Sequence, residues 1–430
     1  MSTQFDNNAP GFKRSRVLYI IEAAVEYFIS ILMGTTYLAR ISLAIGMSDS
    51  QTAILTSLTS FAFTFQILAL FIGNHHNTKS WVIPCHVANQ LLFTFVYLVP
   101  VIELPAGIKP FLLIVPFIVG SLLHNMVQSP KMTWMMSFVA ENDRGSFTAK
   151  KEIFSLISGM TFTYIMGAII DYFDEIGDTN GSFITCGITV FGLMVIHTLL
   201  LIFTKSNKPV HVKEHVSIMK QVKGVLTDKS ILIVIPVSLL YYIGSAISNP
   251  FYSTYQLNEL GFNMSYVAIL AAISSISRAL VSLPLGKFAD KFSFTKMLTL
   301  CYGVKVLSYF VNIFTTPENG MVMYAIYTCL AGIALGGVSS GLTNLIFDHT
   351  PVEKRTGALA VQNTLCGLVS FFTTLAVTPL VDFIQSSGNS LFGLNVYAQQ
   401  VLSAMSMVVF IIVIIYLNTV VKYCAKPHRQ

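Results

Sequence analysis

Uninterrupted apolar runs of about 20 residues recur along the whole chain, and a helix of this length crosses the roughly 30 Å of bilayer hydrocarbon. Only 11% of the residues are charged, about half of what a soluble domain carries. The runs are continuous and do not alternate, which argues against a transmembrane β-barrel. The sequence therefore predicts an all-α, multi-pass membrane protein.

Prolines, glycines, asparagines and clustered charges divide the apolar runs into twelve expected transmembrane helices. The first run is too long for the apolar core of a signal peptide and lacks a small-residue cleavage pattern, so we expect it to be retained. The expected helices cover residues 17–45, 51–73, 81–103, 110–139, 146–172, 181–204, 231–257, 265–286, 296–314, 321–349, 356–385 and 396–421.

The loop cations fix an expected orientation. With the amino-terminal tail in the cytoplasm, nearly all loop lysines and arginines fall on the inner side, and the outer loops hold only Lys109 among many acids. Because cytoplasmic loops are enriched in positive charge, we expect both termini in the cytoplasm and the protein in the plasma membrane. The net charge of +6 follows from this placement and does not indicate a nucleic-acid partner.

The chain carries signs of an internal duplication. The stretch "GMSDSQTAIL" resembles "GFNMSYVAIL", which lies 215 residues later. Arg144 and Arg355 each open an expected helix and are followed 27 residues later by Asp171 and Asp382. Two parallel six-helix repeats are the expected result. We expect a cytoplasmic tail at 1–16, a bundle at 17–204, a basic linker at 205–230, a bundle at 231–421 and a tail at 422–430.

A charged loop between the eighth and ninth expected helices carries a family motif. In "GKFADKFSFTK", Gly286, Asp290 and Lys291 stand at the spacing of the loop signature of the Major Facilitator Superfamily, although a glycine and a base expected further along are replaced. The corresponding loop of the first half, "GNHHNTKSW", keeps Gly73 but lacks the aspartate. Together with the twelve helices and the repeat, this motif makes the chain resemble a bacterial-type secondary transporter of that superfamily.

The resemblance implies a gating role for these loops. Gly286 would allow a tight turn, and the Asp290 carboxylate would meet the positive amino-terminal end of the helix that begins near Arg355. A contact that forms in one state only would bias a conformational equilibrium. The expected gating residues are Gly73, Arg144, Gly286, Asp290, Lys291 and Arg355. The alternative is an ordinary positively charged inner loop.

Several ionisable residues lie inside the apolar runs, where they are costly and mark functional sites. At about 1.5 Å per residue, Glu26, Lys131, Arg278 and Lys305 lie roughly 12–14 Å above the cytoplasmic edge, near the bilayer midplane. Arg40 lies higher in the first helix, whereas Glu22 and Glu152 lie lower in the first and fifth helices. Glu22 and Glu26 share one helical face.

The superfamily resemblance implies that the first, fourth, seventh and tenth helices line a central cavity, where Glu26, Lys131 and Arg278 would converge. We expect Lys131 and Arg278 to bind an anionic or strongly polar substrate, and Glu26 to take up a proton with Glu22 or Glu152 as accessories. A static ion pair between helices is the alternative. Further expected substrate-binding residues are Arg40, His124, Asn125, Gln128 and Asn249, the last at a predicted interruption of the seventh helix.

Other functions receive less support from the sequence. It contains no zinc-protease helix motif, no nucleophile elbow and no phosphate-binding loop, so we expect neither an enzyme nor an ATP-driven pump, and no metal or cofactor. The function predicted is alternating-access transport of a small anionic or zwitterionic solute by a monomer, driven by protons or another coupling ion. A sugar transporter, an efflux pump for amphipathic drugs and a receptor that does not transport remain alternatives.

Overall fold

The computed structural model describes residues 10–62, 64, 78–105, 107–136, 138–139, 144–205, 224–225, 227–351, 355–391 and 393–424. The backbone contacts divide the chain into two compact units. Unit 1 comprises Met1–Ser48, Phe65–Lys213 and Asn263–Ala268, and unit 2 comprises Asp49–Thr64, Glu214–Phe262 and Ile269–Gln430. Each unit therefore includes a short segment from the opposite half of the chain, residues 263–268 in unit 1 and 49–64 in unit 2.

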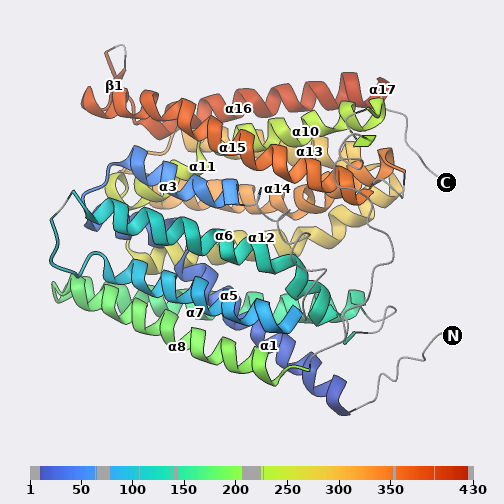
Figure 1. The fold of residues 1–430 in the computed structure, drawn as a ribbon. Helices are drawn as coiled ribbons and strands as arrows, with labels where there is room; N and C mark the ends of the chain where they lie inside the picture. The colour runs from blue at the N-terminus through green and yellow to red at the C-terminus, as the bar shows by residue number, and fades with distance from the viewer. Residues whose placement is uncertain are drawn as a thin grey trace. The chain divides into compact units, whose positions relative to one another are not determined.

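Unit 1 is a bundle of long helices (Figure 1). α1 packs against α7 and α8, and α5 packs against α6 and α8. Its apolar core is centred on Tyr19, Val127, Trp134 and Leu201. The helices are α1 (Pro10–Leu32), α2 (Thr35–Ala44), α5 (Thr78–Leu98), α6 (Lys109–Met136), α7 (Arg144–Glu175) and α8 (Thr179–Phe203).

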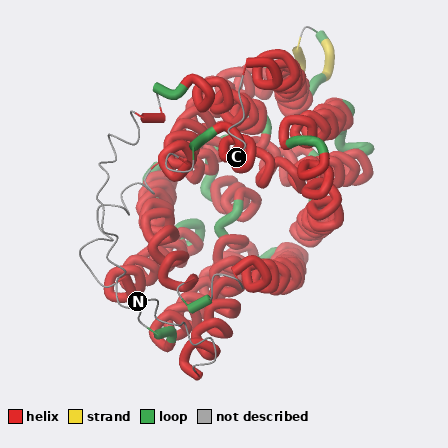
Figure 2. The backbone as a smooth tube through the Cα atoms, turned by 90° about the vertical axis from the view of Figure 1, so that its right-hand side faces the viewer, coloured by secondary structure: helices red, strands yellow, loops and turns green. Residues whose placement is uncertain are grey.

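Unit 2 is a second bundle, in which α13 packs against α14 and α16, α10 against α15 and α16, and α3 against α15 and α11. Viewed close to end-on in Figure 2, the described chain is almost entirely helical apart from a small hairpin. The elements are α3 (Asp49–Ala62), α10 (Lys229–Ala246), α11 (Asn249–Thr254), the π-helical turn η3 (Tyr255–Glu259), α12 (Met264–Lys291), α13 (Phe294–Ile313), α14 (Gly320–His349), α15 (Arg355–Ser386), β1 (Ser390–Leu391), β2 (Leu394–Asn395), α16 (Ala398–Tyr416), the π-helical turn η5 (Leu417–Val421) and α17 (Lys422–Cys424).

Helices coincide with all twelve expected spans, and within the described residues ten of them are long and apolar enough to cross a membrane. The two others are α3, whose description stops at residue 62, and α13, which carries Lys296 and Lys305. The predicted interruption of the seventh span is present, because α10 ends at Ala246 and α11 begins at Asn249.

The first span contains a break that was not expected. α1 ends at Leu32 and α2 begins at Thr35, with Gly34 between them. The last carbonyls of a helix lack partners within it, and here the fully buried Tyr97 hydroxyl donates to the Leu32 carbonyl. A side chain from α5 therefore stabilises the break in the first span.

The loop expected after Gly286 is also placed differently. α12 continues past Gly286 to Lys291, and the turn falls at Phe292 and Ser293. Gly286 is helical, and a Cβ added there would meet nothing within 4 Å. The prediction of a tight turn at Gly286 was therefore wrong. The Ser293 side chain starts the next helix by accepting a hydrogen bond from the Lys296 N–H.

Small residues allow α14 to approach its neighbours closely. A Cβ built on Gly332 would lie 2.5 Å from the Ser274 carbonyl oxygen of α12, and one on Gly337 would lie 2.6 Å from the Cys301 Sγ of α13. Helices in membranes associate through such small-residue contacts, because lipid supplies no hydrophobic driving force between them. Gly332 and Gly337 therefore let α14 pack directly against the backbone of α12 and the side chains of α13.

The two repeated aspartates make matching contacts. The Asp171 carboxylate, on α7, accepts hydrogen bonds from the N–H groups of Met264 and Ser265 at 2.8 and 2.9 Å. The Asp382 carboxylate, on α15, accepts one from the Ser50 hydroxyl. Each aspartate thus meets the first turn of a helix, where unpaired N–H groups and the helix dipole favour negative charge. In both cases that helix comes from the other sequence repeat, which explains the segments exchanged between the units.

Gly332→Ala is expected to lower the melting temperature of the detergent-purified protein, because its methyl group would press against a backbone carbonyl that cannot rotate away. Overpacking of this kind costs about 1–3 kcal/mol. The matched control is Gly303→Ala on α13, which has open space around the added carbon and should leave the melting temperature unchanged or raised. Equal melting temperatures for the two variants would contradict the packing described for α14.

Candidate functional site

Unit 1 contains a buried group of polar and ionisable side chains at the centre of its bundle, contributed by α1, α5, α6 and α8. We call it the charge cluster, and it consists of Glu22, Glu26, His86, Gln90, His124, Gln128, Lys131 and His197.

Lys131 lies at the centre of the charge cluster. Its Nζ donates to Glu22 Oε1 at 2.9 Å and also to Glu26 Oε2. The side chains of Lys131 and Glu22 are 4% and 0% exposed. Desolvating such ions costs several kcal/mol each, which only close pairing offsets. Two carboxylates face one ammonium, so with neutral histidines one negative charge remains uncompensated.

A hydrogen-bonded chain continues from Glu22 into the bundle. Glu22 Oε1 lies 2.8 Å from His197 Nε2, and the other ring nitrogen of His197 lies 2.8 Å from Gln90 Nε2. An amide nitrogen can only donate, so His197 Nδ1 accepts and His197 Nε2 carries the proton that is donated to Glu22. Gln90 therefore selects the histidine tautomer that supports the buried carboxylate.

Glu26 has partners on the opposite side of the charge cluster. Gln128 Nε2 donates to Glu26 Oε1 at 2.7 Å and lies 3.1 Å from His124 Nε2. The Glu26 side chain is 17% exposed and that of His124 is 30% exposed, whereas His197 is fully buried. Glu26 and His124 therefore form the accessible end of the charge cluster, and Glu22 and His197 its enclosed end.

His86 is the least satisfied member. It is 1% exposed, and neither ring nitrogen has a hydrogen-bond partner among the described residues. Its Nε2 lies 4.0 Å from Glu26 Oε1, and its ring centroid lies 4.9 Å from that of His197. A buried polar atom without a partner costs about 1–3 kcal/mol. The charge cluster thus retains unused capacity to bind a proton or a water molecule beside Glu26.

The same side chains resemble a metal-ligand set in spacing. One ligand atom from each of Glu26, His86 and His124 lies within 4.8 Å of the others, and the same holds for Glu22, Glu26 and His197. Both sets share Glu26, to which the Lys131 ammonium is already bonded. A metal ion at Glu26 would have to displace this ammonium, whereas a proton can bind the free carboxylate oxygen or an imidazole without doing so.

The structure brings together five of the predicted site residues: Glu22, Glu26, His124, Gln128 and Lys131. Sequence reasoning missed His86, Gln90 and His197. The depth rule applied to charged residues would have found the two histidines, since at about 1.5 Å per residue they lie roughly 10–12 Å along their helices from Lys79 and Lys205.

Other predicted residues lie outside the charge cluster. Arg40 on α2 forms a bidentate ion pair with Asp174, at 2.6 and 2.8 Å, and also donates to Ser182. Asn125 donates to the Ser121 carbonyl of its own helix. Glu152 is exposed on α7. The Arg40 contacts join neighbouring helices, and the Asn125 contact is made within its own helix. None of these geometries supports substrate or proton binding at Arg40, Asn125 or Glu152.

The remaining predicted residues are placed as follows. Arg278 and Asn249 are exposed in unit 2. Asp290 and Lys291 are exposed at the end of α12, and the Lys291 ammonium lies 5.5 Å from the centroid of the Phe292 ring. Gly73 lies outside the described residues. Arg144 and Arg355 begin α7 and α15, but their side chains lie outside the described part of the chain, so the expected contact of Asp290 with that helix end is untested.

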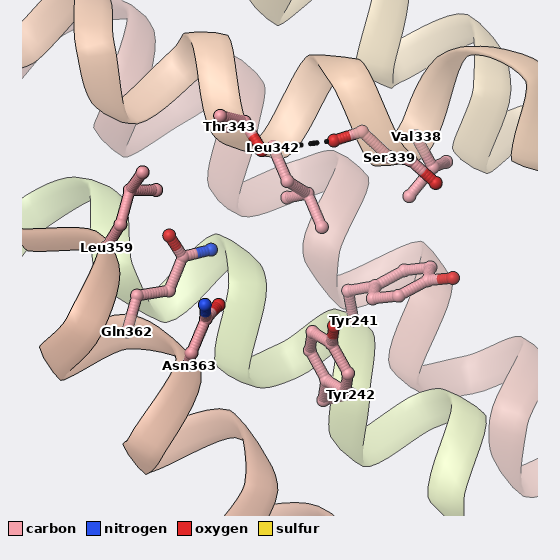
Figure 3. Close-up of a pocket in the computed structure, with 9 residues that line it drawn as sticks. All are labelled: Tyr241, Tyr242, Val338, Ser339, Leu342, Thr343, Leu359, Gln362 and Asn363. Atoms are coloured by element: carbon pink, nitrogen blue, oxygen red, sulfur yellow. Dashed lines mark hydrogen bonds between the residues drawn. The ribbon is translucent and has the colours of Figure 1, made fainter. Parts of the chain in front are cut away.

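A polar pocket of about 240 Å³ lies within unit 2, between α10, α14 and α15 (Figure 3). Its apolar lining is Val338, Leu342 and Leu359. Its polar lining consists of hydroxyl and amide side chains, namely Tyr241, Tyr242, Ser339, Thr343, Gln362 and Asn363. Two of these, Tyr241 and Tyr242, belong to the aromatic residues of the seventh expected helix.

A buried lysine in unit 2 has a different environment from Lys131. Lys305 on α13 is 4% exposed, and its ammonium lies 4.9 Å from the centroid of the Tyr309 ring. Within the described residues no carboxylate forms an ion pair with it. A cation over an aromatic face is stabilised by the ring quadrupole, so Lys305 has a structural partner on its own helix.

Comparison with known proteins identifies one matching family model and several similar folds. The family model described as Major Facilitator Superfamily matches residues 17–374. Similar structures include a mutant of the nucleoside transporter NupG (13% identity, 94% of this chain and 99% of that chain, TM-score 0.76) and a D-xylose-proton symporter (12%, 94% and 97%, TM-score 0.67). A bacterial homolog of the human lysosomal transporter Spinster is also similar (12%, 96% and 98%, TM-score 0.70). No curated protein sequence matches significantly.

Lys131→Met is expected to destabilise the purified protein by about 3–5 kcal/mol, because it leaves two buried carboxylates without their shared cation. Adding Glu22→Gln and Glu26→Gln to this variant should recover part of the loss, since no unpaired charge then remains. Thermal and denaturant unfolding in detergent measure both effects. The exposed Lys287→Met serves as the control and should change stability by less than about 0.5 kcal/mol. A triple variant no more stable than the single one would contradict the pairing.

Proposed function

The chain belongs to the Major Facilitator Superfamily, and on that premise we propose that it is a proton-coupled secondary transporter of a small polar solute. It is an all-α, multi-pass membrane protein with the twelve-helix fold of that superfamily. Superfamily members of this fold work by alternating access around a site near the bilayer midplane. The similar structures include a D-xylose-proton symporter, and at 12% identity this likeness supports the fold and only motivates the coupling proposal.

The observation that carries the proposal is the uncompensated negative charge around Lys131. One proton on Glu26 would bring the two carboxylates and one ammonium to neutrality. Glu26 is the carboxylate at the accessible end, whereas Glu22 is enclosed and receives a hydrogen bond from His197. We therefore assign proton uptake to Glu26 and a permanent counter-charge role to Glu22.

Protonation of Glu26 would change the contacts between α1 and α6. A neutral carboxyl attracts the Lys131 ammonium less strongly, so Lys131 would stay with Glu22 and release Glu26. His86 Nε2 and His124 Nδ1 each lie 4.0 Å from Glu26 Oε1, while His197 bonds Glu22 behind them. The two histidines nearest Glu26, His86 and His124, are positioned to exchange the proton with it through water. A contact that depends on the proton provides the differential interaction that coupling requires.

The charge cluster also bears on the solute. The sequence favoured an anionic or zwitterionic solute bound by Lys131 and Arg278. In the structure Lys131 is already bonded to two carboxylates, so an additional anion there would meet repulsion. We propose that Lys131 serves the proton site and that the solute carries no net negative charge. Transport of sugars remains within this proposal, whereas a simple anion does not.

Topology and gating are proposed from the sequence together with the fold. We propose both termini in the cytoplasm and the protein in the plasma membrane, because of the asymmetric loop cations. We propose that the chain works as a monomer. The end of α12 is proposed as an inner gate through Asp290, with Gly73, Gly286, Lys291, Arg144 and Arg355 as its other members.

The transport proposal is tested in proteoliposomes that contain a pH-sensitive dye. Challenged with a panel of hexoses, nucleosides, amino acids and dipeptides, the wild-type protein should change the luminal pH with at least one solute. Glu26→Gln should abolish that pH change while the same solute still raises the melting temperature of the variant. Glu152→Gln, an exposed carboxylate on α7, is the matched control and should keep the signal.

Two results would refute parts of this proposal. A pH change that persists in Glu26→Gln would remove Glu26 as the coupling residue. A solute that stabilises the protein but crosses the membrane in neither direction, with no proton movement, would identify a receptor that does not transport.

The gating proposal has its own test in the same vesicles. Asp290→Asn should slow solute turnover several-fold while leaving solute binding unchanged, because it weakens a contact made in one conformational state only. Lys287→Gln, on the same exposed end of α12, should leave turnover unchanged if the effect is specific to the carboxylate. Unaltered turnover in Asp290→Asn would show that this loop is an ordinary charged turn.

A further inference from the structure

We propose that the polar pocket of unit 2 binds a small, uncharged ring compound with several hydroxyl groups, such as a monosaccharide. This inference rests on the proposed transport function and adds the chemical class of the solute. It is argued from the charge, polarity, aromatic surface and size of the pocket.

The pocket has no charged lining among the nine described residues that form it. An ionised ligand entering it would lose hydration without gaining a counter-charge, which is strongly unfavourable. Arg278 on α12 is not among the lining residues. Its positive charge is near enough to act on the hydroxyl of Tyr241, which is a lining residue. The lining therefore selects a solute without formal charge.

Gln362 supplies an unused acceptor. Its side chain is 4% exposed, and its Nε2 donates to the Ser238 hydroxyl of α10. That bond fixes the orientation of the amide, and the buried Oε1 has no partner within the described residues. Buried polar atoms are nearly always hydrogen-bonded, and an orphaned one calls for a missing ligand or water. Gln362 Oε1 is thus an unpaired acceptor at the pocket wall, and a small shift of the side chains that cover it would let a solute hydroxyl donate to it.

Further polar groups surround the same space. Gln362 on α15 and Thr343 on α14 approach it from facing helices in Figure 3. The Thr343 hydroxyl donates to the Ser339 carbonyl at 3.3 Å, which leaves its oxygen free to accept. The exposed Asn363 adds an amide that both donates and accepts. Several directed donors and acceptors around one small volume match a compound with several hydroxyl groups.

Two tyrosines provide an aromatic wall. The rings of Tyr241 and Tyr242 are perpendicular, with centroids 5.3 Å apart. Tyr241 is also packed against Tyr302 and Phe410, at 6.0 and 5.8 Å, and is therefore held in place. Tyr242 is only partly buried and lines the pocket together with Asn363 (Figure 3). Its ring offers an apolar face against which the C–H face of a sugar ring can pack.

The volume limits the size of the solute. At about 30 Å³ per water molecule, the pocket holds roughly eight waters, or on the order of ten non-hydrogen atoms. A pyranose fills such a space, whereas an amphipathic drug needs a pocket of about 300–1,000 Å³. The size therefore favours a monosaccharide over the drug substrates considered from the sequence.

The test compares three hexoses that share a ring but differ in charge. Titration calorimetry of the full-length protein in detergent would use D-glucose, D-glucuronate and D-glucosamine, with D-xylose and uridine as smaller and larger neutral probes. We expect D-glucose or D-xylose to bind and raise the melting temperature. Both charged hexoses should bind at least tenfold more weakly than the neutral one, and uridine should not bind.

Variants locate the binding site. Gln362→Leu removes the orphaned acceptor and should weaken binding of the neutral sugar at least tenfold. Gln399→Leu is the matched control, because Gln399 is also a buried glutamine of unit 2 but does not line the pocket. Asn363→Ala, at an exposed position, should weaken binding while keeping the melting temperature of the ligand-free protein. It keeps the test decisive if Gln362→Leu fails to fold.

Three outcomes would overturn the inference: stronger binding of D-glucuronate with loss in Arg278→Gln, binding of uridine without either sugar, or sugar binding that survives both pocket variants. None of these outcomes tests the proton-binding role proposed for the charge cluster. If a charged solute moves protons in the vesicle assay, the transport proposal holds and the proposed sugar site is wrong. If the neutral sugar binds at the pocket but no solute moves protons, the sugar site holds and proton coupling is wrong.

Discussion

The pairing of one buried ammonium with two carboxylates is the interaction on which unit 1 depends. Lys131 joins α6 to α1 at two successive turns, and His197 and Gln90 extend the connection to α8 and α5. In a low-dielectric interior these ions cannot stand unpaired, so the four helices must keep their positions and their register. The same arrangement leaves one negative charge in excess. Binding of a proton would therefore change the contact between Lys131 and Glu26, which also holds α6 against α1.

Much of the fold follows from the sequence, because lipid imposes a simple rule on it. A backbone inside hydrocarbon must satisfy its own hydrogen bonds, so apolar length alone locates helices, and all twelve expected spans coincide with helical segments. The repeat was also readable, since Asp171 and Asp382 stand at equal distances from the helix starts before them. Ends and breaks were less predictable. The break before Gly34 depends on a hydroxyl from Tyr97, and the glycine of the loop motif does not mark the helix end, because α12 continues past Gly286 to Lys291.

The candidate site was predicted in part. Equal depth on two helices correctly predicted that Glu26 and Lys131 meet, and the helical face that Glu22 shares with Glu26 explains why Glu22 joins them. Arg40, predicted to bind substrate although it lies higher in the first span, pairs with Asp174 instead, and the sequence did not indicate that partner. His86 and His197 were passed over because a histidine carries no obligatory charge, although a buried neutral imidazole also needs hydrogen-bond partners. The polar pocket could not be read from the sequence at all, since Tyr242, Thr343 and Gln362 are ordinary residues that only packing brings together.

The reciprocal contacts of Asp171 and Asp382 bear on the origin of the chain. Each repeat provides an acceptor that its own helix starts do not use, and each receives the acceptor of the other. In a twofold pair each copy contributes the same contact to its partner, and the two repeats of this chain exchange their aspartate contacts in that reciprocal way. The contacts between the repeats thus have the bonding scheme of a twofold pair, although only unit 1 places carboxylates and a lysine together in its interior.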